Sequence, residues 1–408
     1  MALAQIACVG RFKHGDGFRS KKLKAVVISG KRSLPVSDGK LYQKVYDEIY
    51  QAATGSPTMK KYHHLGTAEN VLPLNEFGGL PTRNLQQAKF EGASEISGET
   101  FAEQYLGRRL ACSHCPTGCI HIAALREPYG DEPYFYKTSM IAYDFEPIYA
   151  LGSMLGGSDP KGVLRLMERI EVWGLDAMST GVVLAWATEA QERGAISEKE
   201  TMGIKLGWGD YTAYMDAVQL LIEQPNEFYQ ALSRGVEHAA SLYGGEDYAL
   251  AFGGNEMPGY HTGAGAHIGV LIGARHSHLD NAGYSIDQKT LFKKKLTPEE
   301  IAEALLAEER WRQILASLVV CFFARGIYQP DVVSKALHLA GFDIAPEALY
   351  HIGEEIHREK YRFKTREGFS LDKLRLPKRI FETPSPAGKF DEEFIRGAVE
   401  HIKKILFK

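Results

Sequence analysis

Apolar residues recur at helical spacing over most of the chain. Leu41, Val45 and Ile49 stand four positions apart, which predicts an amphipathic helix. Either Ser37 or Asp38 would cap its first turn. The sequence therefore predicts a mainly α-helical protein. Further helices are predicted over 160–174, from 298 toward 321, and over 331–341, 346–359 and 391–406.

Extended structure is predicted in only a few places. Val26–Ile28 forms a short β-branched stretch that a basic lead-in precedes and Gly30 closes, which predicts a strand. One strand cannot form a sheet, so it needs partner strands from this chain or from another. A loop-rich passage is expected over 62–84, and extended segments are expected over 366–369 and 376–379.

Composition limits the kinds of partner that the protein can bind. The chain has 408 residues, of which 44% are hydrophobic, and a net charge of −3. Both signs of charge are spread along it, and the triplet Lys293–Lys295 is read as a solvated face, so neither nucleic acid nor an anionic membrane is an expected partner. No apolar run long enough for a membrane span and no cleavable signal segment is present in the sequence, so a cytoplasmic location is expected.

Three cysteines stand together between residues 111 and 119, at C-x2-C-x3-C spacing. They are Cys112, Cys115 and Cys119. The only cysteine further along the chain is Cys321, in an apolar run that follows a predicted helix and is expected to be buried. Three local thiolates and one distant thiolate suit a cubane iron–sulfur cluster, because each iron takes one thiolate and folding can bring in the last.

Structural zinc is the main alternative for these cysteines. His114 and His121 are available as further ligands, although zinc sites more often use two C-x2-C pairs, or one pair with spaced histidines. A disulfide framework is disfavoured, because five cysteines in 408 residues are sparse and odd in number. The fifth, Cys8, is expected to be an ordinary buried thiol. The spacing favours the cluster over zinc.

Glycine becomes frequent in the stretches 251–261 and 263–267, where it would let backbone amides approach a ligand closely. An arginine, two histidines and an aspartate follow within six positions, and they are a candidate for acid–base chemistry. They are Arg275, His276, His278 and Asp280. Upstream, Asp176, Ser179 and Thr180 either bind a polar ligand or simply cap the next helix, and local reasoning favours capping.

Taken together and in order, several of these stretches resemble the aldehyde:ferredoxin oxidoreductase family of tungsten-pterin enzymes. The matching stretches are 20–26, 112–119, 174–176, 179–181, 256–258, 278–279, Cys321 and 366–368. The resemblance implies a mainly α fold with one helical domain over 37–246, which holds the three-cysteine loop, and another over 247–408, which holds the fourth cysteine. Residues 1–36 would be the remnant of a β-rich pterin-binding domain.

The resemblance also implies site residues. Cys112, Cys115, Cys119 and Cys321 would ligate a [4Fe-4S] cluster. A pterin-contacting D-x-x-G-L-D pattern is matched by Glu171, Gly174, Leu175 and Asp176, with glutamate in place of the usual first aspartate. A related pattern before the last cysteine is less intact, because Ala316 and Val319 stand where the family commonly has aspartate and glycine. His278, with Asp144 or Glu146, would lie near the metal as proton donor or acceptor.

The function implied by the resemblance is oxidation of an aldehyde to a carboxylic acid at a tungsten or molybdenum bis-pterin centre. Electrons would leave through the cluster to ferredoxin or a similar iron–sulfur carrier, and the protein would form a homo-oligomer. Two alternatives are a low-potential reductase subunit acting on an activated aromatic acid, and an iron–sulfur electron-transfer subunit or fragment without pterin.

The resemblance begins inside the last strand of the family's sheet domain. A separate chain that supplies that domain, a truncated or frame-shifted gene, and a longer original product are the three explanations. Under each of them, this chain is expected to hold the cluster better than it holds the metal-pterin.

Overall fold

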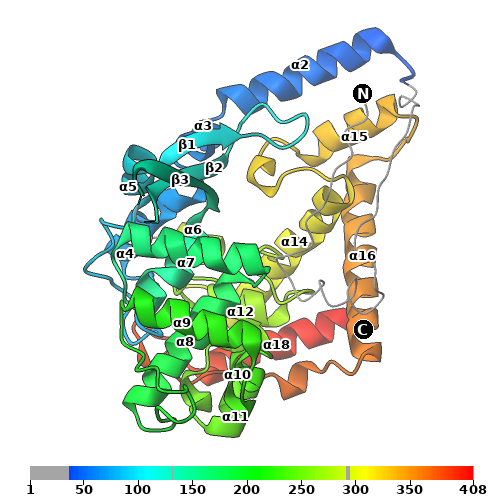
Figure 1. Cartoon of the computed structure of the whole chain (residues 1–408). Helices are drawn as coiled ribbons and strands as arrows, with labels where there is room; N and C mark the ends of the chain where they lie inside the picture. Colours follow the sequence, from blue (N-terminus) through cyan, green and yellow to red (C-terminus); the bar gives the residue numbers. More distant parts are fainter. Residues whose placement is uncertain (1–35, 131, 291–294, 408) are drawn as a thin grey trace. The chain divides into compact units, whose positions relative to one another are not determined.

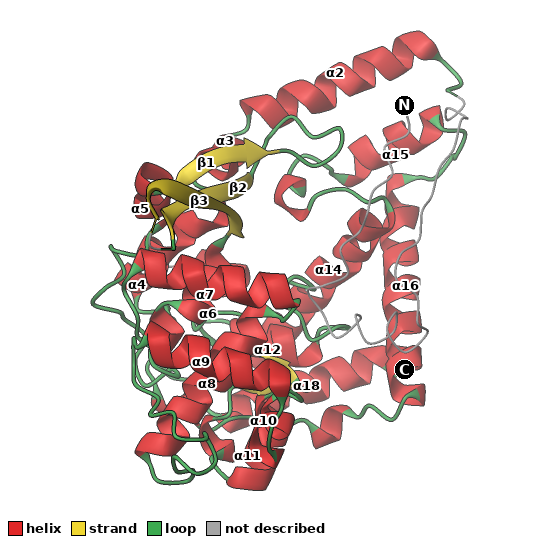
Figure 2. Cartoon of the chain, in the orientation of Figure 1, coloured by secondary structure: helices red, strands yellow, loops and turns green. Residues whose placement is uncertain are grey.

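The computed structural model describes residues 36–130, 132–290 and 295–407. Several sequence features lie outside the described residues: the predicted strand at 26–28, nearly all of the predicted 1–36 segment, Cys8, and the lysines at 293 and 294. Within the described part, helices predominate and strands are few (Figures 1 and 2), which confirms the prediction of a mainly α-helical chain.

The described residues group into two compact units. Unit 1 takes in residues up to His64, together with Arg109–Ile120 and Arg310–Glu359. Unit 2 takes in Leu65–Arg108, His121–Glu309 and the residues from Lys360 onward. Each unit contains residues from both sides of position 246. This grouping by spatial contact does not test the predicted domain boundary at 246/247, which stays a prediction.

Unit 1 is a small helical assembly. Its first helix begins after Asp38, as predicted, because the Asp38 carboxylate accepts hydrogen bonds from two amides of the first turn at 2.9 and 3.0 Å. Lys335 pairs with Glu48 at 2.7 Å where α15 packs against α2. The buried core comprises Ile314, Val333 and Leu349. The elements are α2 (Gly39–Gly55), α3 (Pro57–His64), η4 (Phe322–Ala324), α15 (Pro330–Leu339), and parts of α14 (Pro298–Ser317) and α16 (Pro346–Arg366).

Helix α14 begins with the predicted capping box. The Glu300 amide donates to the Thr297 hydroxyl oxygen at 3.2 Å, and the Thr297 amide donates to the Glu300 carboxylate at 2.9 Å. The end of α14 differs from the prediction. Residues Ala316 and Ser317 are exposed, as are Val319 and Cys321, so the fourth cysteine follows an exposed helix end and not a buried one. The apolar run misled the prediction because its side chains are only partly packed.

Unit 2 contains the main hydrophobic core. Helices α8 and α12 are apolar on nearly all sides because they run through this core. No helix in the described part of the chain combines the length and the apolar character that crossing a bilayer requires. The helices are η1 (Gly66–Asn70), α4 (Val71–Phe77), α5 (Gly98–Gln104), α6 (Phe145–Leu151), η2 (Ser153–Leu155), α7 (Pro160–Trp173), α8 (Ala177–Glu192), α9 (Tyr211–Glu223), α10 (Glu227–Leu232), α11 (Val236–Tyr243), η3 (Glu246–Tyr248), α12 (Ala264–Ile272), α13 (Gly283–Thr290), η5 (Leu371–Lys373), α17 (Arg379–Glu382) and α18 (Glu392–Leu406).

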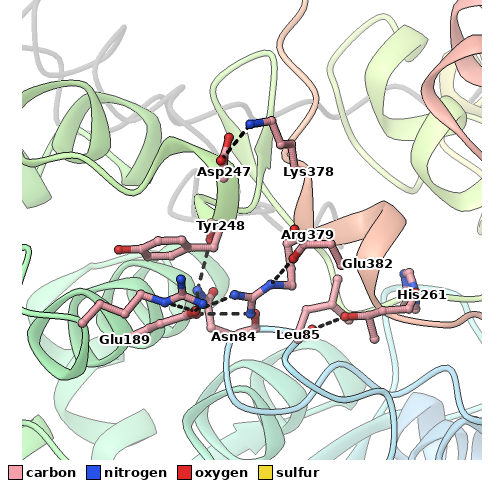
Figure 3. A network of polar contacts seen from close by, with 11 residues as sticks. Asn84, Leu85, Glu189, Asp247, Tyr248, His261, Lys378, Arg379 and Glu382 are labelled. Carbon is pink, nitrogen blue, oxygen red and sulfur yellow. Dashed lines mark hydrogen bonds and ion pairs between the residues drawn. The ribbon is translucent and has the colours of Figure 1, made fainter.

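A buried polar network in unit 2 holds an unusual loop. Arg83, Asn84 and Leu85 all have positive φ, between 45° and 56°, which is uncommon for residues other than glycine. Figure 3 shows how Arg379 lies against this loop: its guanidinium donates to the Asn84 carbonyl at 3.1 Å and pairs with Glu189 at 2.5 Å. The Asn84 amide donates to the Glu189 carboxylate at 2.7 Å. These partners stabilise a backbone that would otherwise be strained.

A three-stranded sheet carries the cysteine loop between its first two strands. The strands are β1 (Leu106–Leu110), β2 (Ile120–Tyr129) and β3 (Glu132–Tyr143), in the order β1-β2-β3. Strands β2 and β3 are antiparallel, with His121 opposite Tyr143 and Leu125 opposite Ser139. A two-residue hairpin joins β4 (Ala251–Phe252) and β5 (Asn255–Glu256). The sequence patterns did not predict this sheet.

Three predicted segments are wrong in detail. The passage 62–84, predicted as loop, contains the end of α3, η1 and α4. The glycine-rich stretch 263–267 is the start of the buried helix α12, where an added Cβ at Gly265 would meet the Asp287 carboxylate at 2.6 Å, so its glycines allow close packing and do not line a ligand loop. Residues 366–369, predicted as extended, are the end of α16 and the turn after it.

Candidate functional site

The cysteine loop of unit 1 is tightly turned. The Cys115 amide donates to the Cys112 carbonyl at 3.1 Å, and His114 and Gly118 adopt left-handed φ values of 61° and 58°. Cys112 is exposed, whereas Cys115 and Cys119 are half-buried. The backbone therefore folds back on itself twice within eight residues, which lets three thiols face one region.

The fourth cysteine lies beside the other three. Burial, together with the charges of Cys321, Cys112 and Cys115, raises the pKa of the Cys119 thiol to about 11. Mutual repulsion of this kind requires that the four sulfurs share one neighbourhood, although Cys321 comes from the segment after α14. Bound cations would reverse the shift, because a coordinating thiol is deprotonated. The donor set therefore fits a cofactor that supplies positive charge.

The two cofactors considered for these cysteines need different spacings of the sulfurs. A cubane places each thiolate on a different iron, so its four sulfurs lie farther apart than the ligands of one tetrahedral zinc. Among the described residues, no three His, Cys, Asp or Glu side chains converge as they would around one metal ion. Of the histidines considered for zinc, His114 is exposed, and His121 is buried in unit 2 with its ring centroid 5.8 Å from that of Tyr143.

Neighbouring groups in unit 1 support the four thiols. The ring of Tyr62, on α3, stacks on Phe323 at 4.1 Å between centroids, two residues after Cys321. The Phe323 amide lies 3.4 Å from the Cys321 sulfur, and the Thr117 amide lies 3.5 Å from the Cys115 sulfur. Amide donors to cluster sulfurs are among the features that set a cluster's reduction potential.

Unit 2 brings together the predicted acid–base residues His278 and Glu146. His278 Nε2 lies 3.1 Å from Glu146 Oε1, and the Tyr260 hydroxyl donates to the same oxygen at 2.9 Å. His278 is buried, at 7% exposure. Burial raises the pKa of Glu146, but the His278 contact and the Tyr260 hydrogen bond outweigh it and hold this pKa below its usual range. Glu146 is therefore a carboxylate at neutral pH.

Aromatic rings enclose this pair, and sequence reasoning missed them. Tyr260 stacks on Tyr284 with centroids 4.0 Å apart and tilts toward Phe145 at 4.9 Å. Burial and the charge of Glu146 hold the pKa of Tyr260 well above its ordinary value. The charge of Asp144 raises this pKa further. Asp144 therefore lies near the pair, at the start of α6. The available signal was Tyr260 itself, which follows directly after the Glu256–Gly259 run.

The other members of the predicted acid–base cluster have structural partners. Arg275 pairs with Asp280 at 2.7 Å. His276 lies 3.1 Å from both the Val270 carbonyl and the Lys364 ammonium. The cluster of four is thus divided by the fold, and only His278 is directed to the Glu146 carboxylate.

Residues Glu171–Asp176 form the turn that ends α7, called the first turn here, and its glycine is not covered by other residues. Gly174 has a left-handed φ of 71°, and no atom lies within 4 Å of where its Cβ would be. Asp176 caps α8 by accepting a hydrogen bond from the Ser179 amide at 2.8 Å, while the Ser179 hydroxyl donates to Glu256 at 2.7 Å. Glu171 is exposed and Leu175 is half-buried. The turn therefore presents the exposed Glu171 carboxylate and the exposed Gly174 backbone at the surface of unit 2.

Residues Ala316–Cys321 form the turn that ends α14, called the second turn here. It also contains a left-handed residue, but its side chains differ from those of the first turn. Val319 has a left-handed φ of 58° and is 83% exposed. Ala316 is also exposed and has no polar atom beyond its backbone. The side chains of this turn therefore do not fit the pterin contacts that the resemblance implies for it, whereas Cys321 fits the cluster.

A mainly helical chain that gathers four thiols in one unit and buries a carboxylate–imidazole pair in the other is a candidate redox protein. Residues 44–407 match the family model described as aldehyde ferredoxin oxidoreductase, domains 2 and 3. The chain belongs to the aldehyde ferredoxin oxidoreductase family.

Two curated relatives are tungsten-containing aldehyde ferredoxin oxidoreductases. The one from Thermococcus kodakarensis is 30% identical over 97% of this chain and 65% of its own length. The one from Pyrococcus furiosus is 29% identical over 93% of this chain and 63% of its own length. A further relative from Pyrococcus furiosus, an aliphatic sulfonate oxidoreductase WOR-like subunit, is 26% identical over 82% of this chain and 51% of its own length. The chain thus spans at most 65% of the length of these relatives.

Among solved structures, a chain of the active-site complex BamBC of benzoyl coenzyme A reductase, bound to 1,5-dienoyl-CoA, has a similar fold. The TM-score is 0.71, with 14% sequence identity, and the match covers 96% of this chain and 66% of the other. At this identity the similarity concerns the fold alone.

Proposed function

We propose that this chain is the cluster-bearing part of a tungsten-pterin oxidoreductase that oxidises an aldehyde to a carboxylic acid. The observation that carries the proposal is the gathering of Cys112, Cys115, Cys119 and Cys321 in unit 1, in a chain whose family has that activity in its name. The chain spans only about 65% of the length of its relative from Thermococcus kodakarensis. The activity is therefore proposed for this chain together with the part of the family's sequence that it does not span.

The four thiols would hold a [4Fe-4S] cluster, and the first turn, with Gly174 and Asp176, would contact one pterin. When bound, the metal-pterin supplies two-electron oxidation chemistry, and the cluster supplies single-electron transfer. The second turn does not fit the other pterin through its side chains, so the proposal assigns it only the cluster ligand Cys321.

The pair of His278 and Glu146 would handle protons at the substrate. In this proposal, the His278 imidazole exchanges a proton with the substrate oxygen at Nδ1, while its Nε2 is held by the Glu146 carboxylate at 3.1 Å. Glu146 orients the ring through this contact, and the stacked rings of Tyr260 and Tyr284 exclude water. A neutral residue at 146 would weaken the orientation of the ring.

Metal analysis of anaerobically purified protein tests the cofactor assignment. We expect about four irons and four acid-labile sulfides per chain. Cys112→Ser and Cys321→Ser should each lower the iron content by most of its value, whereas Cys8→Ser should leave it unchanged. Zinc in place of iron, or equal iron in all variants, would overturn the cluster assignment.

Aldehyde-dependent dye reduction, measured in the assembled enzyme, tests the proton-handling pair. His278→Ala should lower kcat by about 100-fold or more while the iron content and the cluster spectrum stay constant. Glu146→Gln should have a smaller effect in the same direction and move the pH profile of the rate. An unchanged rate in His278→Ala would remove this residue from the proposal.

A pterin-less electron-transfer subunit is the second candidate. The side chains of the second turn favour it, because they do not fit the pterin contacts that the resemblance implies there, and one relative is itself named as a subunit. Metal analysis of protein made in its native host tests this candidate. Iron and sulfide without tungsten or molybdenum would support it.

A further inference from the structure

We propose that Glu309, a buried carboxylate on α14, is a positioning residue that keeps the His278 imidazole aligned with Glu146. It acts through the loop that carries His278, defined here as residues 274–281 and called the histidine loop. The position of His278 matters for turnover only if this imidazole exchanges a proton with the substrate, so the inference rests on the proposed function.

The Glu309 carboxylate binds both ends of the histidine loop. One oxygen, Oε1, accepts a hydrogen bond from the Ala274 amide at 2.8 Å, and the other, Oε2, accepts one from the side-chain amide of Asn281 at 3.0 Å. The same Asn281 nitrogen donates to the Gly269 carbonyl, near the end of α12, at 2.9 Å. His278 lies between the two anchored positions, so a shift of either end would move its ring.

The two donors that meet Glu309 require a side chain with two acceptor atoms. The Asn281 nitrogen lies between the Glu309 carboxylate and the Gly269 carbonyl, and both of these groups accept hydrogen bonds. The Asn281 amide must therefore turn its nitrogen toward them. A glutamine at position 309 has the same length, but it offers an acceptor to one donor and a second donor to the other.

Backbone strain explains why the histidine loop needs such anchors. His276, within the loop, and Ala282, directly after it, have positive φ values of 55° and 50°, which are uncommon for residues other than glycine. A second buried carboxylate, Asp280, accepts hydrogen bonds from the amides of Arg275 at 2.8 Å and Ser277 at 3.2 Å. The loop keeps this shape because its hydrogen bonds outweigh the strain.

Lysines balance the charge of the two buried carboxylates. The Lys364 ammonium donates to the Gly273 carbonyl, next to the histidine loop, at 3.1 Å. Burial lowers the pKa of Lys364 to about 8, while the charges of Glu309 and Asp280 act to raise it. The same two charges also raise the pKa of Lys360, against the effect of its burial. Glu309 therefore belongs to a charge-balanced network, in which its hydrogen bonds to the loop are charge-assisted and strong.

A double-mutant cycle on aldehyde-dependent dye reduction, measured in the assembled enzyme, tests the inference. Glu309→Gln should lower kcat by about 10-fold and leave KM nearly unchanged, because the imidazole loses its alignment while substrate binding is retained. In the His278→Ala background, the same substitution should cause no further loss, since it acts only through the missing imidazole. Asn281→Ala removes one of the two anchors and should give the same pattern with a smaller loss.

Hydrogen exchange followed by mass spectrometry gives a second measurement, which does not depend on turnover. Amides of the histidine loop should exchange about 10-fold faster in Glu309→Gln, because one end of the loop is released while the core of unit 2 stays folded. The matched control is Glu189→Gln, which changes a similarly buried carboxylate that pairs with Arg379 (Figure 3). It should change neither kcat nor the exchange of the histidine loop.

The outcomes distinguish this inference from the proposed function. An unchanged rate in His278→Ala contradicts the proposed proton transfer itself. If His278→Ala is slow but Glu309→Gln is as fast as the parent, or slows both backgrounds by the same factor, the positioning role alone is wrong. Should Glu309→Gln fail to fold, the cycle of Asn281→Ala with His278→Ala decides, and equal losses in both backgrounds would overturn the inference.

Discussion

The first turn and the second turn are the same backbone structure with different side chains. In each, the left-handed residue donates its amide to the carbonyl three residues back at 3.1 Å. The next amide donates to the carbonyl five residues back, at 3.0 Å in the first turn and 3.1 Å in the second. This pairing is the Schellman motif, which normally requires glycine at the left-handed position. Gly174 meets that requirement and Val319 does not.

The residue that ends each turn also has the same structural task in both. Asp176 accepts a hydrogen bond from an amide of α8, and Cys321 accepts one from an amide of η4. One turn therefore presents a carboxylate and the other a sulfur at the equivalent position. The comparison teaches that one turn geometry places different polar atoms after a helix, and that under the proposed function the residue at the sixth position decides which ligand is bound.

The second turn keeps its geometry without the glycine that favours it. A β-branched residue in the left-handed region costs about 1–3 kcal/mol, so contacts elsewhere must maintain the conformation. The tertiary contacts that hold Cys321 beside the other thiols are the candidate source of that stabilisation.

The largest expected effect is a difference in iron content between substitutions at Cys321 and at Asp176, the sixth residues of the two turns. Cys321→Ser should remove most of the iron, because the cluster loses one of its ligands, whereas Asp176→Asn should retain all of it. Iron per chain and the absorbance of the cluster measure both. Equal iron in the two variants would show that the turns do not differ in this chemistry.

The next effect concerns the left-handed position of the first turn. Gly174→Val should lower the free energy of unfolding by about 1–3 kcal/mol, because it introduces the strain that the second turn already carries. There is open space at this position, so steric overlap does not contribute. Urea unfolding followed by circular dichroism measures the change. An unaltered midpoint would contradict the assignment of strain.

Loss of the carboxylate cap should be a smaller perturbation. Asp176→Ala should destabilise the protein by about 1 kcal/mol, because the amide of Ser179 loses its acceptor. Asp176→Asn is the matched control, since asparagine caps a helix about as well. If both variants unfold at the same urea concentration as the parent, capping is not what Asp176 contributes.

The smallest expected effect is a gain. Val319→Gly should stabilise the cluster-free chain by about 0.5–1 kcal/mol, because relief of the left-handed strain exceeds the added entropy of glycine in the unfolded state. Val319→Ala is the control, as it keeps the strain of a Cβ without the branch. Thermal unfolding without iron measures both variants, and a loss of stability in Val319→Gly would contradict the strain at this residue.

Local signals in the sequence predicted local structure well. Asp38 and the Thr297–Glu300 box mark helix starts, and Gly174 marks a helix end, because each acts through hydrogen bonds within a few residues. The sheet was missed because β2 and β3 carry Pro128 and several charged residues, and their outer faces are exposed. Such strands depend on cross-strand pairing, which one segment alone does not reveal.

In the candidate site, too, the features encoded by nearby residues were predicted and those that depend on long-range contacts were not. The spacing of the first three cysteines, with Cys321 as the one cysteine further along the chain, indicated a common centre, and the resemblance implied the same four residues as cluster ligands. The pairing of Glu146 with His278, and the enclosure by Tyr260 and Tyr284, depend on long-range contacts that no local pattern encodes. The glycines of α12 were misread as a ligand loop, because close helix packing and ligand approach both favour a residue without a side chain.

The clamp of Arg379 on the loop at Asn84 has a consequence for protein synthesis. The loop, its partner Glu189 and the guanidinium come from early, middle and late parts of the chain. The buried carboxylate lacks the Arg379 guanidinium until residue 379 has left the ribosome, so the loop at Asn84 gains this partner only late in the synthesis of unit 2.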